Sequence, residues 1–170
     1  MIPTQGVNHI ALSVADMKRT LEFYTGVLGL RLVGLFPMHG VPGASHAFLD
    51  MGGGRMLSFI QFAGPPEKRE GVTHPADPGG PSAVATMHHL ALQVPDAAAA
   101  ATLRDRVKQA GIRVSHPYDH GFCTSIYMKG PDGEQLEVTY QTRPLGPQEL
   151  DAETFRALGI SDAERAALTR

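Results

Sequence analysis

Apolar and polar residues alternate in two short segments that are close copies of each other. Residues 9–16 read His-Ile-Ala-Leu-Ser-Val-Ala-Asp, and residues 89–96 read His-Leu-Ala-Leu-Gln-Val-Pro-Asp. This alternation predicts a strand in each case, with the large apolar side chains on one face and the histidine beside small residues on the other. The recurrence predicts that the chain contains an internal duplication.

The same series of elements follows each of these strands. Asp16 and Asp96 are suited to cap helices predicted over 17–28 and 97–110. Three further strands are predicted in each half, and a glycine-rich or Pro-Asp-Gly turn joins the last two. These last strands are expected over 45–51, 55–62, 123–129 and 134–140. One β-α-β-β-β unit cannot bury both faces of its sheet. The sequence therefore predicts an α+β fold in which two tandem units form one cupped, eight-stranded mixed sheet.

These units divide the chain into four segments. The first module is expected over about 5–63 and the second over about 86–140, with a linker at 64–85 that is rich in glycine and proline. Residues 141–170 are expected to form one or two short helices packed outside the sheet, one of them beginning at Ser161. All four segments are assigned to a single domain.

Composition excludes several classes of protein. Of the 170 residues, 42% are hydrophobic and 19% charged, which is typical of a soluble globular domain. No apolar run approaches the roughly 18 residues of a membrane span, and residues 1–6 lack a targeting pattern, so a cytoplasmic location is expected. The net charge of −2 with scattered basic residues disfavours nucleic acid as a partner. Because Cys123 is the only cysteine, a metal ion would be held by histidines and carboxylates.

His9, His89 and Glu137 are the candidate metal ligands. Alternation in the strand that holds Glu137 places its side chain on the same face as the two histidines, and Ser58 occupies the corresponding position of the first half. Two imidazoles and one carboxylate suit a six-coordinate Fe(II) or Mn(II) ion, and serine at position 58 leaves a coordination position open. Structural histidines in duplicated strands are the alternative. His88 is expected to face the core and to make a hydrogen bond.

The duplication and these three residues resemble the vicinal oxygen chelate superfamily over residues 7–140. That superfamily includes glyoxalases, fosfomycin-resistance transferases, epimerases, extradiol ring-cleaving dioxygenases and metal-free drug-binding proteins. Residues 119–133, which read Asp-His-Gly-Phe-Cys-Thr-Ser-Ile-Tyr-Met-Lys-Gly-Pro-Asp-Gly, are similar to the extradiol dioxygenase signature. The resemblance implies that His120 is the catalytic acid and base and that Tyr127 orients the substrate hydroxylate. It also implies an Fe(II) cofactor, with a catechol-like small molecule and dioxygen as substrates.

Alternation in the first half places His46 and Phe48 on the same face as Ser58, so the three are expected to line the substrate pocket or simply to pack there. Three alternatives to the dioxygenase remain open. A Mn(II)-dependent thiol transferase would need cations, for which Lys129 and Arg55 are candidates. A glyoxalase or epimerase usually has a fourth protein ligand, and a metal-free binding protein usually lacks the histidines. Open sheet edges and the resemblance both favour a homodimer.

Overall fold

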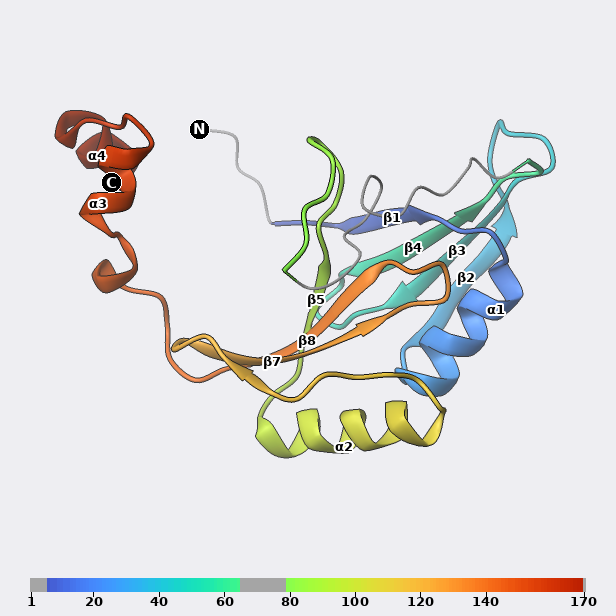
Figure 1. Cartoon of the computed structure of the whole chain (residues 1–170). Helices are drawn as coiled ribbons and strands as arrows, with labels where there is room; N and C mark the ends of the chain where they lie inside the picture. The colour runs from blue at the N-terminus through green and yellow to red at the C-terminus, as the bar shows by residue number, and fades with distance from the viewer. Residues whose placement is uncertain (1–5, 65–78, 170) are drawn as a thin grey trace.

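The two halves of the chain fold as β-α-β-β-β modules, as the repeat predicts. A computed structural model describes residues 6–64 and 79–169. The first module contains β1 (His9–Ser13), α1 (Met17–Leu21), the π-helix η1 (Glu22–Val27), β2 (Arg31–Pro37), β3 (Ser45–Asp50) and β4 (Met56–Gln61). The second contains β5 (Leu90–Gln93), α2 (Ala97–Gln109), β6 (Tyr118–Asp119), β7 (Cys123–Lys129) and β8 (Gln135–Gln141). The chain is thus an α+β protein built from two tandem modules (Figure 1).

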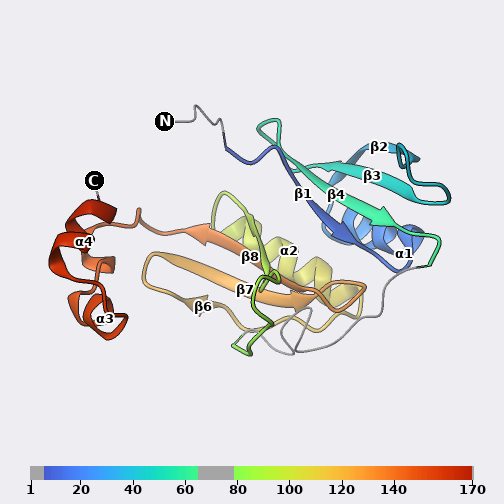
Figure 2. The same cartoon turned by 90° about the horizontal axis from the view of Figure 1, so that it is seen from above.

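The strands form two separate four-stranded sheets. Their strand orders are β1-β4-β3-β2 and β5-β8-β7-β6. The pairs β1–β4 and β5–β8 are parallel, and all other pairs are antiparallel. In the part of the chain that the structure describes, no ladder joins the two sheets, so the eight strands do not form the single continuous sheet that the sequence predicts. Figure 2 shows the two sheets as distinct bodies, each with its own helix.

Helix starts and strand faces agree with the predicted pattern. The side chains of Asp16 and Asp96 each accept a hydrogen bond from the backbone N–H three residues later, at 3.0 and 2.9 Å. In β1 the even-numbered residues are less exposed than His9 and its neighbours on the other face. In β8, Leu136 and Val138 are buried in a hydrophobic core to which both modules contribute. Each sheet therefore turns one face to this core and leaves the histidine face accessible.

The second strand of the second module is shorter than predicted. The expected strand after Gly111 is reduced to an isolated bridge between Val114 and Met128 and to the two residues of β6. Pro117 lies between these two pairings and has no N–H to contribute to a ladder. The sheet of the second module consequently ends in a short edge strand beside His120.

The modules are joined through the first helix and the turn between β7 and β8. The hydroxyl of Tyr24, which is fully buried, donates a hydrogen bond of 2.8 Å to Glu134 Oε1. Asp132 in the same turn accepts from the backbone N–H of Ala15 at 2.9 Å and from the Arg19 guanidinium at 2.6 Å. Burial raises the pKa of the Glu134 carboxyl. This polar junction fixes the turn against α1 and η1, although no strand of one sheet pairs with a strand of the other.

Replacing Tyr24 with phenylalanine is expected to destabilise the fold by about 1–3 kcal/mol, because the partly buried Glu134 loses one of its hydrogen-bond donors and keeps only the backbone N–H of Asp132 among those described. Because the pKa of Glu134 is raised in the folded protein, protonation of Glu134 stabilises the fold. This stabilisation is lost as the pH rises through the raised pKa. The Tyr24 hydroxyl offsets part of that loss, so the deficit of the variant should be larger at about pH 7 than at about pH 4. Chemical denaturation at both pH values measures it.

Substitution of the exposed Lys18 by glutamine, in the adjoining helix α1, is the matched control, and it should leave the unfolding free energy unchanged. A deficit in Tyr24→Phe that is the same at both pH values would contradict the role assigned to the Glu134 contact.

The C-terminal tail forms the short helices α3 (Ala152–Ala157) and α4 (Asp162–Leu168), preceded by the 3-10 turn η2 (Pro147–Glu149). Figures 1 and 2 show both helices standing away from the two sheets, and none of their described residues is buried. The helices are therefore confirmed, whereas the expected packing against the sheet is not observed. None of the helices described is long and apolar enough to cross a membrane. Most of the predicted linker falls at 65–78, outside the described residues.

Candidate functional site

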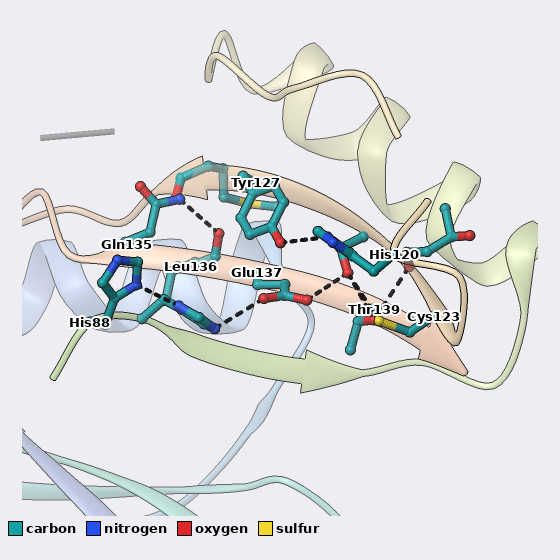
Figure 3. A network of polar contacts seen from close by, with 12 residues as sticks. His88, His120, Cys123, Tyr127, Gln135, Leu136, Glu137 and Thr139 are labelled. Carbon is teal, nitrogen blue, oxygen red and sulfur yellow. Dashed lines mark hydrogen bonds and ion pairs between the residues drawn. The ribbon is translucent and has the colours of Figure 1, made fainter. Parts of the chain in front are cut away.

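Four of the five predicted catalytic and metal-binding residues lie together on the open face of the second sheet. His89 directly precedes β5, His120 follows β6, Tyr127 lies in β7 and Glu137 in β8. They line a pocket of about 430 Å³. The other residues lining this pocket are Ala91, Gln93, Phe122, Cys123, Thr139 and Gln141. Figure 3 shows Glu137 at the centre of the group, with Tyr127 and His120 beside it.

His89 and Glu137 form the part of the predicted metal site that the second module supplies. Nε2 of His89 lies 3.1 Å from Oε2 of Glu137, and the side chain of Glu137 is only 8% exposed. Neighbouring ligands of an octahedral ion, each about 2.1 Å from the metal, lie about 3.0 Å apart. The separation of these two atoms therefore fits a shared divalent cation, and an imidazole with a carboxylate is a suitable donor set for one.

Ser125 is a site residue to which sequence reasoning gave no role. Its hydroxyl, buried in β7, donates a hydrogen bond of 2.5 Å to Glu137 Oε1 and lies 3.0 Å from the hydroxyl oxygen of Thr139. One carboxylate oxygen of Glu137 is thus held by the protein, while the other faces His89. Part of this role could have been predicted from the sequence, because alternation in β7 places Ser125 and Tyr127 on the same face. The contact between Ser125 and Glu137 could not have been predicted, because it also depends on the antiparallel register that pairs Tyr127 with Glu137.

Replacing Ser125 with alanine is expected to weaken divalent-metal binding about 10- to 100-fold, because a ligand that loses its supporting hydrogen bond is free to turn. The fold should be retained, because alanine is smaller than serine and fits in the same space. Titration of metal-free protein with Mn(II) measures the effect. Thr102→Ala is the control, because it also removes a hydroxyl group, one that donates to the backbone oxygen of Ala98 within α2, and Thr102 does not line the pocket. Unchanged affinity in Ser125→Ala would contradict the anchoring role.

His120 and Tyr127 form a second polar pair in the same pocket. Nε2 of His120 lies 2.9 Å from the phenol oxygen of Tyr127. Burial raises the pKa of Tyr127, and the negative charge of Glu137 raises it further. The phenol therefore stays protonated at neutral pH. It can act as a hydrogen-bond donor toward an oxygen atom in the pocket, while His120 can accept or return a proton.

The predicted pocket residues of the first module gather around His9. His46 Nε2 lies 2.6 Å from the Ser58 hydroxyl oxygen, and the Phe48 ring lies 4.3 Å from the His46 ring and 5.6 Å from the His9 ring, between centroids. Burial lowers the pKa of His46, and the neighbouring His9 lowers it further. The sequence placed these side chains correctly on one face. That face belongs to the first sheet, and none of these four residues lines the pocket of the second.

The structure therefore brings together two of the three predicted metal ligands. Among residues 6–64 and 79–169, no three histidine, cysteine or acidic side chains converge in a way that could hold a metal ion. His9 lies on the first sheet and is not joined to His89 and Glu137. The physical reason is the way the modules meet: α1 and η1 contact the β7–β8 turn, and the edges of the two sheets are not paired.

Comparison with known proteins identifies the family. The model of the glyoxalase/bleomycin resistance protein/dioxygenase superfamily matches residues 6–138, and the chain belongs to this family. A curated relative, named "Putative ring-cleaving dioxygenase MhqO" from Bacillus subtilis, is 36% identical over 72 residues. That match covers 41% of this chain and 22% of the relative, so the matched segment spans less than a quarter of that protein's length.

Solved structures show the same fold. A glyoxylase/bleomycin resistance protein/dioxygenase domain from Frankia sp. EAN1pec has a TM-score of 0.65 at 20% identity, covering 81% of this chain and 98% of that one. The fosfomycin resistance protein FosX from Listeria monocytogenes, solved with Mn(II), has a TM-score of 0.59 at 17% identity, covering 87% and 99%. At these identities the likeness establishes the fold, and the reaction must be argued from the site.

Proposed function

We propose that this protein is an Fe(II)-dependent dioxygenase that cleaves a catechol-like aromatic diol outside its two hydroxyl groups. The observation that carries the proposal is the presence of two close pairs in one pocket, His89 with Glu137 and His120 with Tyr127. We assign metal binding to the first pair, and proton transfer and substrate orientation to the second. The partial match to a relative that bears a ring-cleaving dioxygenase name supports this choice within the family. Mn(II) or another divalent ion is the alternative cofactor.

Each group in the pocket has a distinct task. Bound Fe(II) would supply the Lewis acidity that makes a diol hydroxyl acidic and the redox chemistry that dioxygen requires. Tyr127, kept as a phenol by its raised pKa, donates to the substrate oxygen and fixes its direction. His120, at 2.9 Å from that phenol, takes up the proton that the substrate hydroxyl releases and returns it to the ring-opened product. Both atoms of the dioxygen molecule end in that product.

The third ligand in this proposal is His9 of a second copy of the chain. His9 lies on the accessible face of its sheet and does not meet the other two ligands within one chain. In a symmetric dimer, the first module of one copy would face the second module of the other, so that two equivalent complete sites form. This arrangement would also bring His46, Phe48 and Ser58 to the substrate pocket as the sequence predicts. We therefore propose a homodimer as the functional unit.

The alternative reactions have less support from the pocket. No lysine or arginine is among the described residues that line it, whereas a transferase acting on a phosphonate would need cations there. Ser58 contacts His46 and supplies no carboxylate, which a glyoxalase or epimerase would use as a fourth ligand. A metal-free binding protein would have no use for the close pairing of His89 with Glu137.

Metal analysis of protein purified without oxygen tests the proposal. We expect about one iron per chain, a new absorption band when catechol is added, and consumption of dioxygen with formation of a ring-opened product. Tight Mn(II) binding with thiol consumption on an epoxide would instead support the transferase. Protein that binds no divalent metal would refute both enzymes and support small-molecule sequestration.

A further inference from the structure

The residue that precedes each predicted histidine ligand contacts the Nδ1 atom of that histidine. Asn8 Oδ1 lies 2.8 Å from His9 Nδ1, and His88 Nδ1 lies 2.8 Å from His89 Nδ1. Asn8 and His88 occupy the same position in the two repeats. Both are exposed, so the expectation that His88 faces the core is wrong. The two modules therefore make the same contact with two different side chains.

In the first module the contact fixes where the ring of His9 carries its proton. An amide oxygen has no hydrogen to donate, so the hydrogen bond to Asn8 Oδ1 requires N–H at Nδ1 of His9. The neutral ring then keeps its lone pair at Nε2. His9 itself is exposed on its sheet.

In the second module a relay of two rings gives the same result. His88 Nε2 lies 2.9 Å from the backbone carbonyl oxygen of Gly80, which can only accept, so this nitrogen carries the proton of neutral His88. Nδ1 of His88 is then an acceptor, and Nδ1 of His89 must be the donor across their 2.8 Å contact. The lone pair of neutral His89 is left at Nε2, 3.1 Å from Glu137 Oε2. Two acceptors at this distance repel each other unless a metal ion or a proton lies between them.

We propose that Asn8 and His88 are positioning residues that hold His9 and His89 in the Nδ1–H form and direct each Nε2 lone pair toward a divalent cation. The inference rests on the proposed metal site and assigns the two side chains that prepare its imidazole ligands. Supporting hydrogen bonds of this kind fix the tautomer and orientation of a ligand ring, and their loss typically costs about 10- to 100-fold in metal affinity. The duplicated modules thus reach one chemical result through an amide in one case and an imidazole in the other.

Two exchange variants and two deletion variants test the proposal by titration of Mn(II) into metal-free protein. His88→Asn and Asn8→His give each module the acceptor of the other, and affinity should stay close to that of the wild type. His88→Leu and Asn8→Leu remove the acceptor with little change of size, and affinity should fall about 10- to 100-fold. Equal losses in the asparagine and leucine variants at position 88 would overturn the proposal, because a packing role would not distinguish them.

Nitrogen-15 NMR of the histidine rings in metal-free protein provides a readout that does not depend on metal binding. We expect protonated Nδ1 in both His9 and His89 of the wild type, and loss of this preference for His89 in His88→Leu. Neutral rings protonated at Nε2 in the wild type would overturn the proposal even if the protein binds Mn(II). Failure of the wild type to bind Mn(II) despite Nδ1–H rings would refute the proposed metal function instead, so the two failures are distinguishable.

Discussion

Replacing Glu137 with alanine should abolish metal retention, with binding weakened by more than about 100-fold. Glu137 is the only carboxylate lining the pocket as described, and its nearly buried side chain faces His89 through one oxygen and Ser125 through the other. Without it, the remaining imidazole ligands would hold a six-coordinate ion weakly and would leave its charge uncompensated. Metal content after dialysis and Mn(II) titration of metal-free protein both measure the loss.

Glu149→Gln is the matched control for this variant. It also removes a glutamate charge, but its partner is Arg143 in the C-terminal tail and it lies outside the pocket. Metal affinity of the control should equal that of the wild type, and circular dichroism should show that both variants are folded. Full metal retention in Glu137→Ala would contradict its role as a ligand.

Replacing His120 with phenylalanine should leave the metal bound but lower kcat by about 10²- to 10⁴-fold. His120 contacts Tyr127 rather than Glu137, so its loss removes a proton acceptor from the pocket without removing a predicted ligand. KM should change much less than kcat, and the limb of the pH profile that reports this base should disappear. Steady-state oxygen consumption with a catechol, across a range of pH values, measures these effects.

His116→Phe provides the control for this substitution, because His116 is exposed and does not line the pocket. Its turnover should match that of the wild type. Equal metal loss in His120→Phe and Glu137→Ala would refute the separation between proton transfer and metal binding.

Local patterns in the sequence predicted the parts of the fold that depend on neighbouring residues. The repeat around His9 and His89 gave both modules, and the capping aspartates gave the starts of both helices. Strand alternation placed Glu137 on the same face as His89, because side chains two residues apart in a strand point the same way. The family signature added His120 and Tyr127, which the structure places within hydrogen-bonding distance.

What the sequence could not predict depends on contacts between distant segments. The placement of the modules rests on the Tyr24–Glu134 hydrogen bond, which no local pattern reveals. The support of Glu137 by Ser125 depends on strand register and side-chain conformation. The prediction that His88 faces the core is wrong because His88 precedes β5. Outside the strand, alternation no longer determines where a side chain points.

Mixing two inactive variants measures most directly whether the metal centre is shared between chains. His9→Ala and Glu137→Ala homodimers should each fail to bind Mn(II), whereas a mixture that is unfolded and refolded together should regain about one quarter of the wild-type sites. Random pairing makes about half of the dimers mixed, and each mixed dimer has one intact site of two. No recovery of binding, in a mixture shown by light scattering to contain dimers, would contradict a centre built from His9 of one chain and His89 with Glu137 of the other.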